Sequence, residues 1–529
     1  MHWFDELAHS IDAFLSSKGK VVCNAGLSVS GLQHVGRLRG EIILNHFIAS
    51  HLRSRGLEVQ QHLVLYTQDR WKGSPGQVEQ FPGDEGREYV GWRLLDVPDP
   101  QGCHENWVDH FWLDFAESME FFAPGVQVAS TSEIYERPDM RALVLELISR
   151  AEEVRIVLNR YRPRNPHPQG WIPFEPLCNA CKKIGEARTL EVRDEEALYE
   201  CTCGDRGASP LHLGKLNWRL EWPALWKVLQ VDVEPFGKDH AAPGGSRESC
   251  QIMAETVLDI TPPFGIPYEW VGYAEGGRDM GDMASSDFRG FGPKEWLAVA
   301  DPEVLRFVFA NAHIKRRIVL DLSKVDSYHQ TYDQAETSYY ESREDDLSRV
   351  YELSQLGSPR EEMPYQISYR HAALLSQVAP EEELLAWSVR RLRETELLDR
   401  SLKAEERERL ERRLKQSLVW ARTYGPADIR VSLLQRLPEK VLSRLTEEDR
   451  KALSSLASQL SDVPWKENTI KEAMVKLTSG GELPVSTKRF FGSLYMVFLG
   501  KPSGPRAAPL LAVLDRDFVI GRLREASGS

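Results

Sequence analysis

The segment Lys20–Thr67 constrains the fold more than any other part of this 529-residue chain. It starts with the apolar run Val21–Cys23, turns through glycines and serines, and then shows apolar residues at helical spacing across Leu38–Leu52. Gly56 supplies a left-handed stop for that helix, and His62–Leu65 is predicted as a second buried strand. Because a helical crossover places the two strands parallel, this pattern predicts a doubly wound α/β sheet with ligand sites at the carboxyl ends of its strands.

A second strand, loop and helix are predicted within Val231–Leu258. The strand ends near Phe236, the polar loop is Gly237–His240, and a helix follows Gly245. If both strands belong to one sheet, the polar loops of the two units face the same crevice.

Helical patterns dominate from Pro302 onward and are clearest at Glu381–Ser417 and Thr446–Leu460. The last third of the chain is therefore predicted to be all-α. Asp326–Glu362 is polar and rich in Tyr, Ser and Glu, and it is predicted to be a loose connector.

Four cysteines form a CxxC pair and a CxC pair separated by 19 residues. Four thiolates at such spacings can bind one Zn²⁺ tetrahedrally and leave no open position, so the metal would be structural. A redox pair or a chance cluster is the alternative. The predicted ligands are Cys178, Cys181, Cys201 and Cys203, and the remaining Cys23, Cys103 and Cys250 are expected to be buried as small apolar residues.

The formal charge of −13 argues against a nucleic-acid partner, because Lys and Arg dominate phosphate binding. However, residues 401–529 carry +7 and residues 1–400 carry −20, so the basic helical end keeps such a partner possible. No run approaches the roughly 18 apolar residues of a membrane helix, and residues 1–15 mix polar with apolar side chains. We expect a cytoplasmic protein without a membrane segment, and no pattern specifies its oligomeric state.

The loop Ser28–Arg37 places small residues, His34 and Gly36 at a helix N-terminus, where free N–H groups and a partial positive charge suit a phosphate. The alternative is a structural histidine that only caps the helix. Glu41 lies seven residues after His34, two helical turns along the same face, where it could meet a cationic substrate group or be an ordinary surface residue.

The segment His34-Val-Gly-Arg37 resembles the HIGH motif of class I aminoacyl-tRNA synthetases, and the surrounding sequence resembles class I lysyl-tRNA synthetases. This resemblance covers essentially the whole chain. Five further stretches carry it: DVPDPQGCHE at 96–105, KLNWRLEWP at 215–223, EPFGKDH at 234–240, IPYE at 266–269 and LGKPSGPR at 499–506.

The resemblance implies an α/β Rossmann-type catalytic domain with a zinc-knuckle insertion, followed by an all-α C-terminal domain. It implies ATP-dependent activation of lysine to lysyl-adenylate, with Mg²⁺ on the phosphates and structural Zn²⁺, and transfer to tRNA, the expected acceptor being tRNA-Lys. The implied domains are 1–170 (first Rossmann half), 171–210 (zinc insertion), 211–300 (second Rossmann half with a KMSKS-like loop), 301–365 (helical connector) and 366–529 (anticodon-binding-like).

The resemblance also implies three groups of site residues. The catalytic group is His34, Gly36, Arg37, Ser285, Ser286 and Arg289. The ATP-binding group is Ser30, His34, Gly36, Lys238, Asp239 and Met283, with Asp239 on the ribose hydroxyls. The amino-acid pocket is Gly26, Ser28, Glu41, Trp218, His240 and Tyr268, with Glu41 receiving the lysine ε-ammonium.

Three departures from the family pattern affect this site. Asp282 and Asp287 stand where the KMSKS loop has lysines, a four-charge reversal beside a triphosphate that Arg278 and Arg289 could partly compensate. Tyr66-Thr67 replaces a pair of aspartates after the second strand, which puts recognition of the substrate α-amino group in question. Arg37 occupies the fourth HIGH position and adds a cation near the phosphates.

These departures leave three hypotheses. The first is a working lysine–tRNA ligase whose loop uses substitute arginines. The second is a diverged paralogue with altered or lost adenylation that acts on another acceptor or binds an amino acid or tRNA. The third is a zinc-stabilised scaffold without catalysis, since a fold alone does not fix a function.

Overall fold

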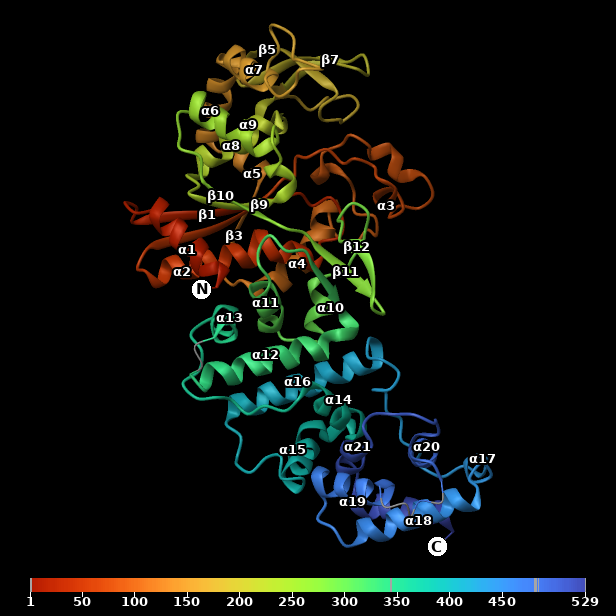
Figure 1. Cartoon of the computed structure of the whole chain (residues 1–529). Helices are drawn as coiled ribbons and strands as arrows, with labels where there is room; N and C mark the ends of the chain where they lie inside the picture. Colours follow the sequence, from red (N-terminus) through yellow and green to blue (C-terminus); the bar gives the residue numbers. More distant parts are fainter. Residues whose placement is uncertain (1, 343–344, 480–482, 484, 529) are drawn as a thin grey trace.

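The computed structural model describes residues 2–342, 345–479, 483 and 485–528. In Figure 1 the α/β part of the chain occupies the upper half of an elongated molecule, and the C-terminal helices form the lower half. One hydrophobic core lies on one face of the main sheet and continues as far as Tyr369 and Trp420 in the lower half, a second lies on the other face of the sheet, and a third lies among the C-terminal helices.

The main sheet has five parallel strands in the order β10-β9-β1-β2-β3. The chain runs outward from β1 through β2 to β3 and then returns to β9 and β10 on the opposite side of β1. The predicted doubly wound sheet is confirmed, with its topological switch between β1 and β9. The strands are β1 (Lys20–Leu27), β2 (Glu58–Leu65), β3 (Gln127–Ser130), β9 (Val233–Gly237) and β10 (Phe264–Tyr268).

Helices cover both faces of this sheet, as a doubly wound fold requires. One face packs against α1 (Trp3–Phe14), α2 (Asn45–Ser54) and α4 (Trp107–Phe122). The other packs against α5 (Thr131–Glu136), α6 (Pro138–Ser149), α7 (Ala151–Asn159), α8 (Trp218–Leu229) and α9 (Ser246–Thr256). A short helix, α3 (Pro75–Val78), lies in the connection between β2 and α4.

The helix predicted from His34 onward does not start as a regular α-helix. A 3₁₀ turn, η1 (Val35–Leu38), and a π-helical segment, η2 (Arg39–Leu44), precede α2. The close approach of Tyr268 accounts for a glycine here, because a Cβ at Gly40 would lie 2.2 Å from that ring. The other 3₁₀ turns are η3 (Glu85–Tyr89), η4 (Leu94–Asp96), η5 (Leu211–Leu213), η6 (Lys238–Ala241), η7 (Leu322–Lys324) and η8 (Glu381–Glu383).

The cysteine-rich insertion forms the end of the molecule drawn at the top of Figure 1. It contains an antiparallel three-stranded sheet, β5-β6-β7, and is flanked by the antiparallel pair of β4 and β8. These strands are β4 (Phe174–Glu175), β5 (Ala187–Arg193), β6 (Glu196–Cys201), β7 (Arg206–Pro210) and β8 (Lys215–Leu216).

A second small sheet carries the KMSKS-like segment. Its strand order is β12-β11-β13, with β13 parallel to β11. The region 301–365, expected to be a helical connector, also contains the short strand β13, because the apolar run at Ile318 pairs with β11 earlier in the chain. The elements are β11 (Val271–Glu275), β12 (Arg278–Asp282), β13 (Ile318–Asp321), α10 (Pro293–Leu297) and α11 (Pro302–Asn311).

The predicted loose connector is wrong, because its described part is mostly helical, in α12 (Val325–Tyr340) and α13 (Asp346–Ser354). Several of its polar residues are buried against other helices. Glu336 accepts hydrogen bonds from Arg409 at 2.8 and 2.9 Å and from the Tyr351 hydroxyl at 2.9 Å. Polar composition alone therefore misled the prediction.

The described part of the last third is helical, and the prediction of an all-α region is confirmed. The pattern at Glu381–Ser417 is two helices, α15 and α16, and Thr446 caps α18 by accepting a hydrogen bond from the Asp449 N–H. None of the described helices combines the length and the apolarity that crossing a membrane requires. The helices are α14 (Tyr369–Val378), α15 (Leu384–Glu394), α16 (Ala404–Thr423), α17 (Glu439–Leu442), α18 (Glu447–Ser461), α19 (Glu467–Ser479), α20 (Thr487–Leu499), α21 (Ala507–Val513) and α22 (Arg516–Ser527).

Candidate active site

A cavity of about 550 Å³ lies at the carboxyl ends of β1, β9 and β10, beside the switch point. The loops of both predicted strand-loop-helix units contribute to it, together with the segment after β12. Most of the residues singled out from the sequence line it: Gly26, His34, Gly36, Arg37, Glu41, Trp218, Asp239, His240, Tyr268, Met283, Ser285 and Arg289.

Ser28, Ser30, Ser286 and Lys238 are not among the residues that line this cavity. The carbonyl oxygens of Ser30 and Ser286 accept hydrogen bonds from Gln77 and Ser74, at 2.8 and 2.7 Å, which attaches the first loop and the KMSKS-like loop to the segment around α3. Lys238 is 2.5 Å from a Glu269 carboxylate oxygen and lies over the Trp270 ring.

His34 precedes η1, but its side chain makes no capping hydrogen bond. The alternative of a purely structural capping histidine therefore finds no support. Burial, followed by the positive charge of Arg37, lowers the pKa of His34 to about 3, and the ring is neutral at physiological pH. Its Nδ1 is buried and has no hydrogen-bond partner within the described residues. A neutral imidazole of this kind can donate a hydrogen bond to a phosphate oxygen.

Glu41 is a buried carboxylate on the cavity wall, with 7 % of its side chain exposed. One oxygen, Oε1, is 3.3 Å from Nη1 of Arg37, and the other, Oε2, is buried without a partner in the part of the chain that the structure describes. Burial, and next the Glu41 charge, raises the pKa of Tyr268 well above its usual value, so that phenol is neutral. An unsatisfied buried carboxylate oxygen is costly unless a ligand completes it, which marks a site for a cation.

Aromatic rings also line this cavity. Tyr66 stands edge-on to Trp218 with ring centroids 5.6 Å apart, Trp218 stacks on Trp222 at 5.2 Å, and His240 lies 5.8 Å from Trp218. Burial raises the pKa of Tyr66 well above its usual value. The aspartate pair expected here is thus replaced by a neutral aromatic surface, and a Cβ at Gly26 would lie 2.6 Å from the Tyr66 ring.

The acidic residues of the KMSKS-like loop are paired with arginines. Arg317 donates to Asp282 at 2.5 Å and to both oxygens of Asp279 at 2.6 and 3.1 Å. Arg289 is 3.2 Å from Asp287, whereas Arg278 lies across from Glu275 in the β11–β12 hairpin. The four-charge reversal is therefore offset by counter-ions, of which the sequence predicted Arg289 and missed Arg317.

Sequence reasoning did not assign Tyr66, Trp222, Glu234 or Arg317 to the site, although Trp222 and Glu234 lie in stretches that carry the family resemblance. Glu234 accepts from Asn24 at 3.0 Å, Trp226 at 2.7 Å and Arg247 at 3.0 Å. This buried network joins β1, α8 and α9 to β9. The only sequence signal for Arg317 was a pair of arginines before an apolar run.

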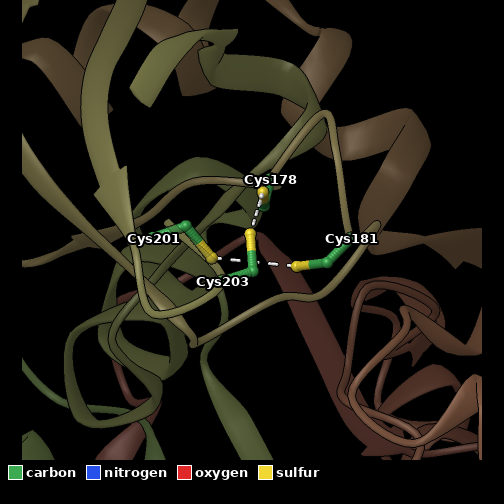
Figure 2. Close-up of side chains that lie close together, drawn as sticks. All are labelled: Cys178, Cys181, Cys201 and Cys203. Carbon is green, nitrogen blue, oxygen red and sulfur yellow. Dashed lines mark hydrogen bonds between the residues drawn. The ribbon is translucent and has the colours of Figure 1, made fainter. Parts of the chain in front are cut away.

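The sulfur atoms of Cys178, Cys181, Cys201 and Cys203 converge on one point, as Figure 2 shows, and all lie within 4.8 Å of one another. The Cys178–Cys203 and Cys181–Cys201 pairs are each 3.7 Å apart. Tetrahedral Zn–S bonds of about 2.3 Å require S···S separations of roughly 3.8 Å. The donor set and its dimensions therefore fit Zn²⁺.

A second group of possible metal ligands was missed by the sequence reasoning. Ligand atoms of Asp99, Cys103, His104 and His110 lie within 4.8 Å of one another, and Asp99 Oδ1 is 2.9 Å from His110 Nδ1. Cys103 is exposed, so the prediction that it is buried is wrong, whereas Cys23 and Cys250 are buried as expected. The sequence feature that could have predicted this group is the close spacing of its four members, which lie in one short loop and the first turn of α4. An O, S, N, N donor set suits Zn²⁺.

A doubly wound parallel sheet with a polar cavity at its switch point, and a phosphate-suited turn after its first strand, defines a Rossmann-type nucleotide-binding protein. The family model described as tRNA synthetases class I (K) matches residues 1–357, and that described as anticodon binding domain matches residues 430–527. The chain belongs to the class I (K) tRNA synthetase family, whose members use ATP.

Several full-length relatives are named lysine–tRNA ligase. The protein from Aeropyrum pernix is 42 % identical over 543 residues, covering 100 % of this chain and 98 % of its own length. The Pyrococcus horikoshii protein is 30 % identical and the Methanosphaera stadtmanae protein 28 % identical, each covering 99 % of both chains.

Proposed function

We propose that this chain is a lysine–tRNA ligase, which activates lysine with ATP to lysyl-adenylate and transfers the lysyl group to the terminal ribose of tRNA-Lys. The observation that carries the proposal is the buried Glu41 carboxylate, whose Oε2 has no hydrogen-bond partner among the described residues, placed in the same cavity as the HIGH-like turn and the KMSKS-like loop. A buried carboxylate beside the aromatic rings of this cavity favours an amino acid with a cationic side chain.

In this proposal the lysine ε-ammonium binds Glu41, while Trp218 and Tyr268 enclose its alkyl stem and Gly26 and His240 surround its backbone end. Ser28 belongs to the loop after β1 and does not line the cavity. His34 and the turn at Gly36 hold the triphosphate, Met283 flanks the nucleotide, and Lys238 positions Glu269 near it. Ser30 lies outside the cavity lining, and its carbonyl attaches this loop to Gln77. Asp239, half exposed at the cavity, takes the ribose hydroxyls. ATP enters as its Mg²⁺ complex, so that metal arrives with the substrate.

As the lysine carboxylate attacks the α-phosphorus, negative charge moves onto the leaving pyrophosphate. His34, Arg37 and Arg289, with the hydroxyls of Ser285 and Ser286, are the groups of this chain proposed to stabilise that charge. The C-terminal helices are proposed to bind the anticodon arm, which the +7 charge of residues 401–529 favours.

Lysine-dependent ATP–pyrophosphate exchange, with and without tRNA-Lys, tests the proposal. We expect robust exchange with lysine and none with glutamate or norleucine. The acidic loop favours one competing function, a paralogue that binds lysine without adenylation. Lysine binding by calorimetry without any exchange would establish that alternative, and no lysine binding at all would reject both.

Metal analysis of the purified chain should find about two zinc equivalents, one at each cluster. Cys203→Ser should remove one equivalent and lower the thermal unfolding midpoint by several degrees, because metal binding contributes to folding. His110→Ala should remove the other equivalent. Cys250→Ala lies outside both clusters and should keep both metals, and full zinc content in Cys203→Ser would contradict the assignment.

A further inference from the structure

Arg37 joins the amino-acid end of the cavity to the KMSKS-like loop. Its Nη1 is 3.3 Å from Glu41 Oε1, and its Nε and Nη2 are each 3.3 Å from the Ser285 hydroxyl oxygen. All three residues line the same cavity. One guanidinium therefore contacts both the proposed lysine-binding carboxylate and the loop that is proposed to approach the triphosphate.

These contacts are long for charged groups. Ion-paired hydrogen bonds usually measure about 2.7–2.9 Å, and a carboxylate that holds an arginine firmly does so with two parallel bonds. Arg317 binds Asp279 in that way, at 2.6 and 3.1 Å. Arg37 instead makes a single contact to Glu41, so the guanidinium is held loosely.

The two partners also differ in their freedom to move. The side chain of Glu41 is 7 % exposed and lies in the packed segment η2, whereas that of Arg37 is 24 % exposed to the cavity. A ligand that competes for the carboxylate would therefore displace the arginine and leave Glu41 in place. The ε-ammonium of lysine is such a ligand, because it is compact, carries the same charge as Arg37 and can reach the unpaired Oε2.

The displaced arginine would add a cation at the turn where the triphosphate is expected, and nearby cations of the described loop region already have carboxylate partners. Arg317 pairs with Asp279 and Asp282, and Lys238 pairs with Glu269. Arg289 lines the cavity but shares its charge with Asp287, 3.2 Å away. Arg37 is three residues from His34 and one from Gly36, at the turn where the triphosphate is expected.

We propose that Arg37 is an exchangeable cation that couples the two substrates. It neutralises Glu41 while the amino-acid pocket is empty, and the lysine ε-ammonium displaces it toward the triphosphate. Lysine binding thereby completes the ATP site, and an amino acid without a cationic side chain does not. This inference rests on the proposed lysine–tRNA ligase function.

Calorimetry with the full chain tests the coupling. The dissociation constant of Mg²⁺·α,β-methylene-ATP is measured without an amino acid, with saturating lysine and with norleucine, which has no ε-ammonium. In the wild type we expect lysine to tighten analogue binding about tenfold and norleucine to change it less than about twofold. In Arg37→Gln lysine should also have less than about a twofold effect, whereas lysine alone should bind several-fold more tightly, because no arginine has to leave Glu41.

Two further variants test whether the coupling between lysine and the ATP analogue depends on Arg37 in particular. Arg289→Gln removes another cavity-lining arginine that does not contact Glu41, and it should weaken the analogue while preserving the effect of lysine. Arg37→Lys should restore part of the coupling that Arg37→Gln loses. Tenfold coupling in Arg37→Gln, or weaker lysine binding by that variant, would overturn the proposal. A wild type that binds no lysine defeats the proposed function as well, whereas lysine binding with coupling that is independent of Arg37 defeats only this inference.

Discussion

Replacing Glu41 by glutamine is expected to lower kcat/KM for lysine by about 10²–10³-fold. The substitution keeps the shape of the side chain but removes the buried negative charge that the ε-ammonium requires. Loss of one partner of a buried, hydrogen-bonded charge pair costs about 2–5 kcal/mol, or roughly 30- to 5,000-fold, which brackets this range. The dissociation constant of Mg²⁺·α,β-methylene-ATP should not rise, and it should fall by up to about tenfold, because Arg37 no longer has a Glu41 carboxylate to neutralise. Steady-state pyrophosphate exchange and calorimetry measure the two effects.

Glu269→Gln is the matched control for this variant. Glu269 also lines the cavity, but Lys238 already neutralises it at 2.5 Å. Its substitution should affect lysine less than tenfold. If Glu41→Gln weakened lysine and the ATP analogue equally, or if Glu269→Gln were the more harmful change for lysine, the assignment of Glu41 to the ε-ammonium would be wrong.

The second large effect is expected from Arg317→Gln, which should lower kcat for lysine-dependent pyrophosphate exchange by about 10–100-fold, or roughly 1.4–2.8 kcal/mol. The substitution leaves Asp279 and Asp282 unpaired, and Asp282 lines the cavity beside the proposed triphosphate position. Uncompensated negative charge there opposes the charge that develops on the leaving pyrophosphate. Stability should change little, because the Arg317 side chain is 34 % exposed.

Asp282→Asn supplies the internal test of this explanation. Alone it should leave exchange within about threefold of the wild type, because Arg317 keeps its two bonds to Asp279. Combined with Arg317→Gln it should recover most of the lost rate, since one of the two unpaired charges is gone. A double variant as slow as Arg317→Gln, with an unchanged thermal unfolding midpoint, would show that Arg317 acts by some route other than neutralising this loop.

The sequence predicted those parts of the site in which residues adjacent in the chain create the chemistry. The turn around His34 and Gly36 follows a recognisable strand, and the cysteine spacing sets the geometry of four thiolates almost by itself. Trp218, His240 and Tyr268 were found only through their resemblance to a family pattern, because a single aromatic residue has no chemical signature of its own.

The site residues that were missed depend on segments far apart in the chain. Arg317 reaches Asp282 because β13 pairs with β11. The short apolar run that forms β13 does not by itself predict that pairing. Tyr66 was noted as a departure, but its role as an aromatic wall requires Trp218, which lies on a helix much later in the chain. The same limitation caused the error at α12, whose polar residues are paired with arginines of α16.

The sequence by itself determined the doubly wound sheet, the all-α end and the presence of a four-thiolate cluster, because hydrophobic periodicity and ligand spacing are local properties. Only the tertiary structure decided whether the negative charges of the KMSKS-like loop have counter-ions. From Asp282 and Asp287 alone, the sequence predicted a loop that repels the triphosphate. In the folded chain, Arg317 and Arg289 lie beside these aspartates as counter-ions. Electrostatic energy depends on distance in space, and the chain brings these charges together only when the small sheet has formed.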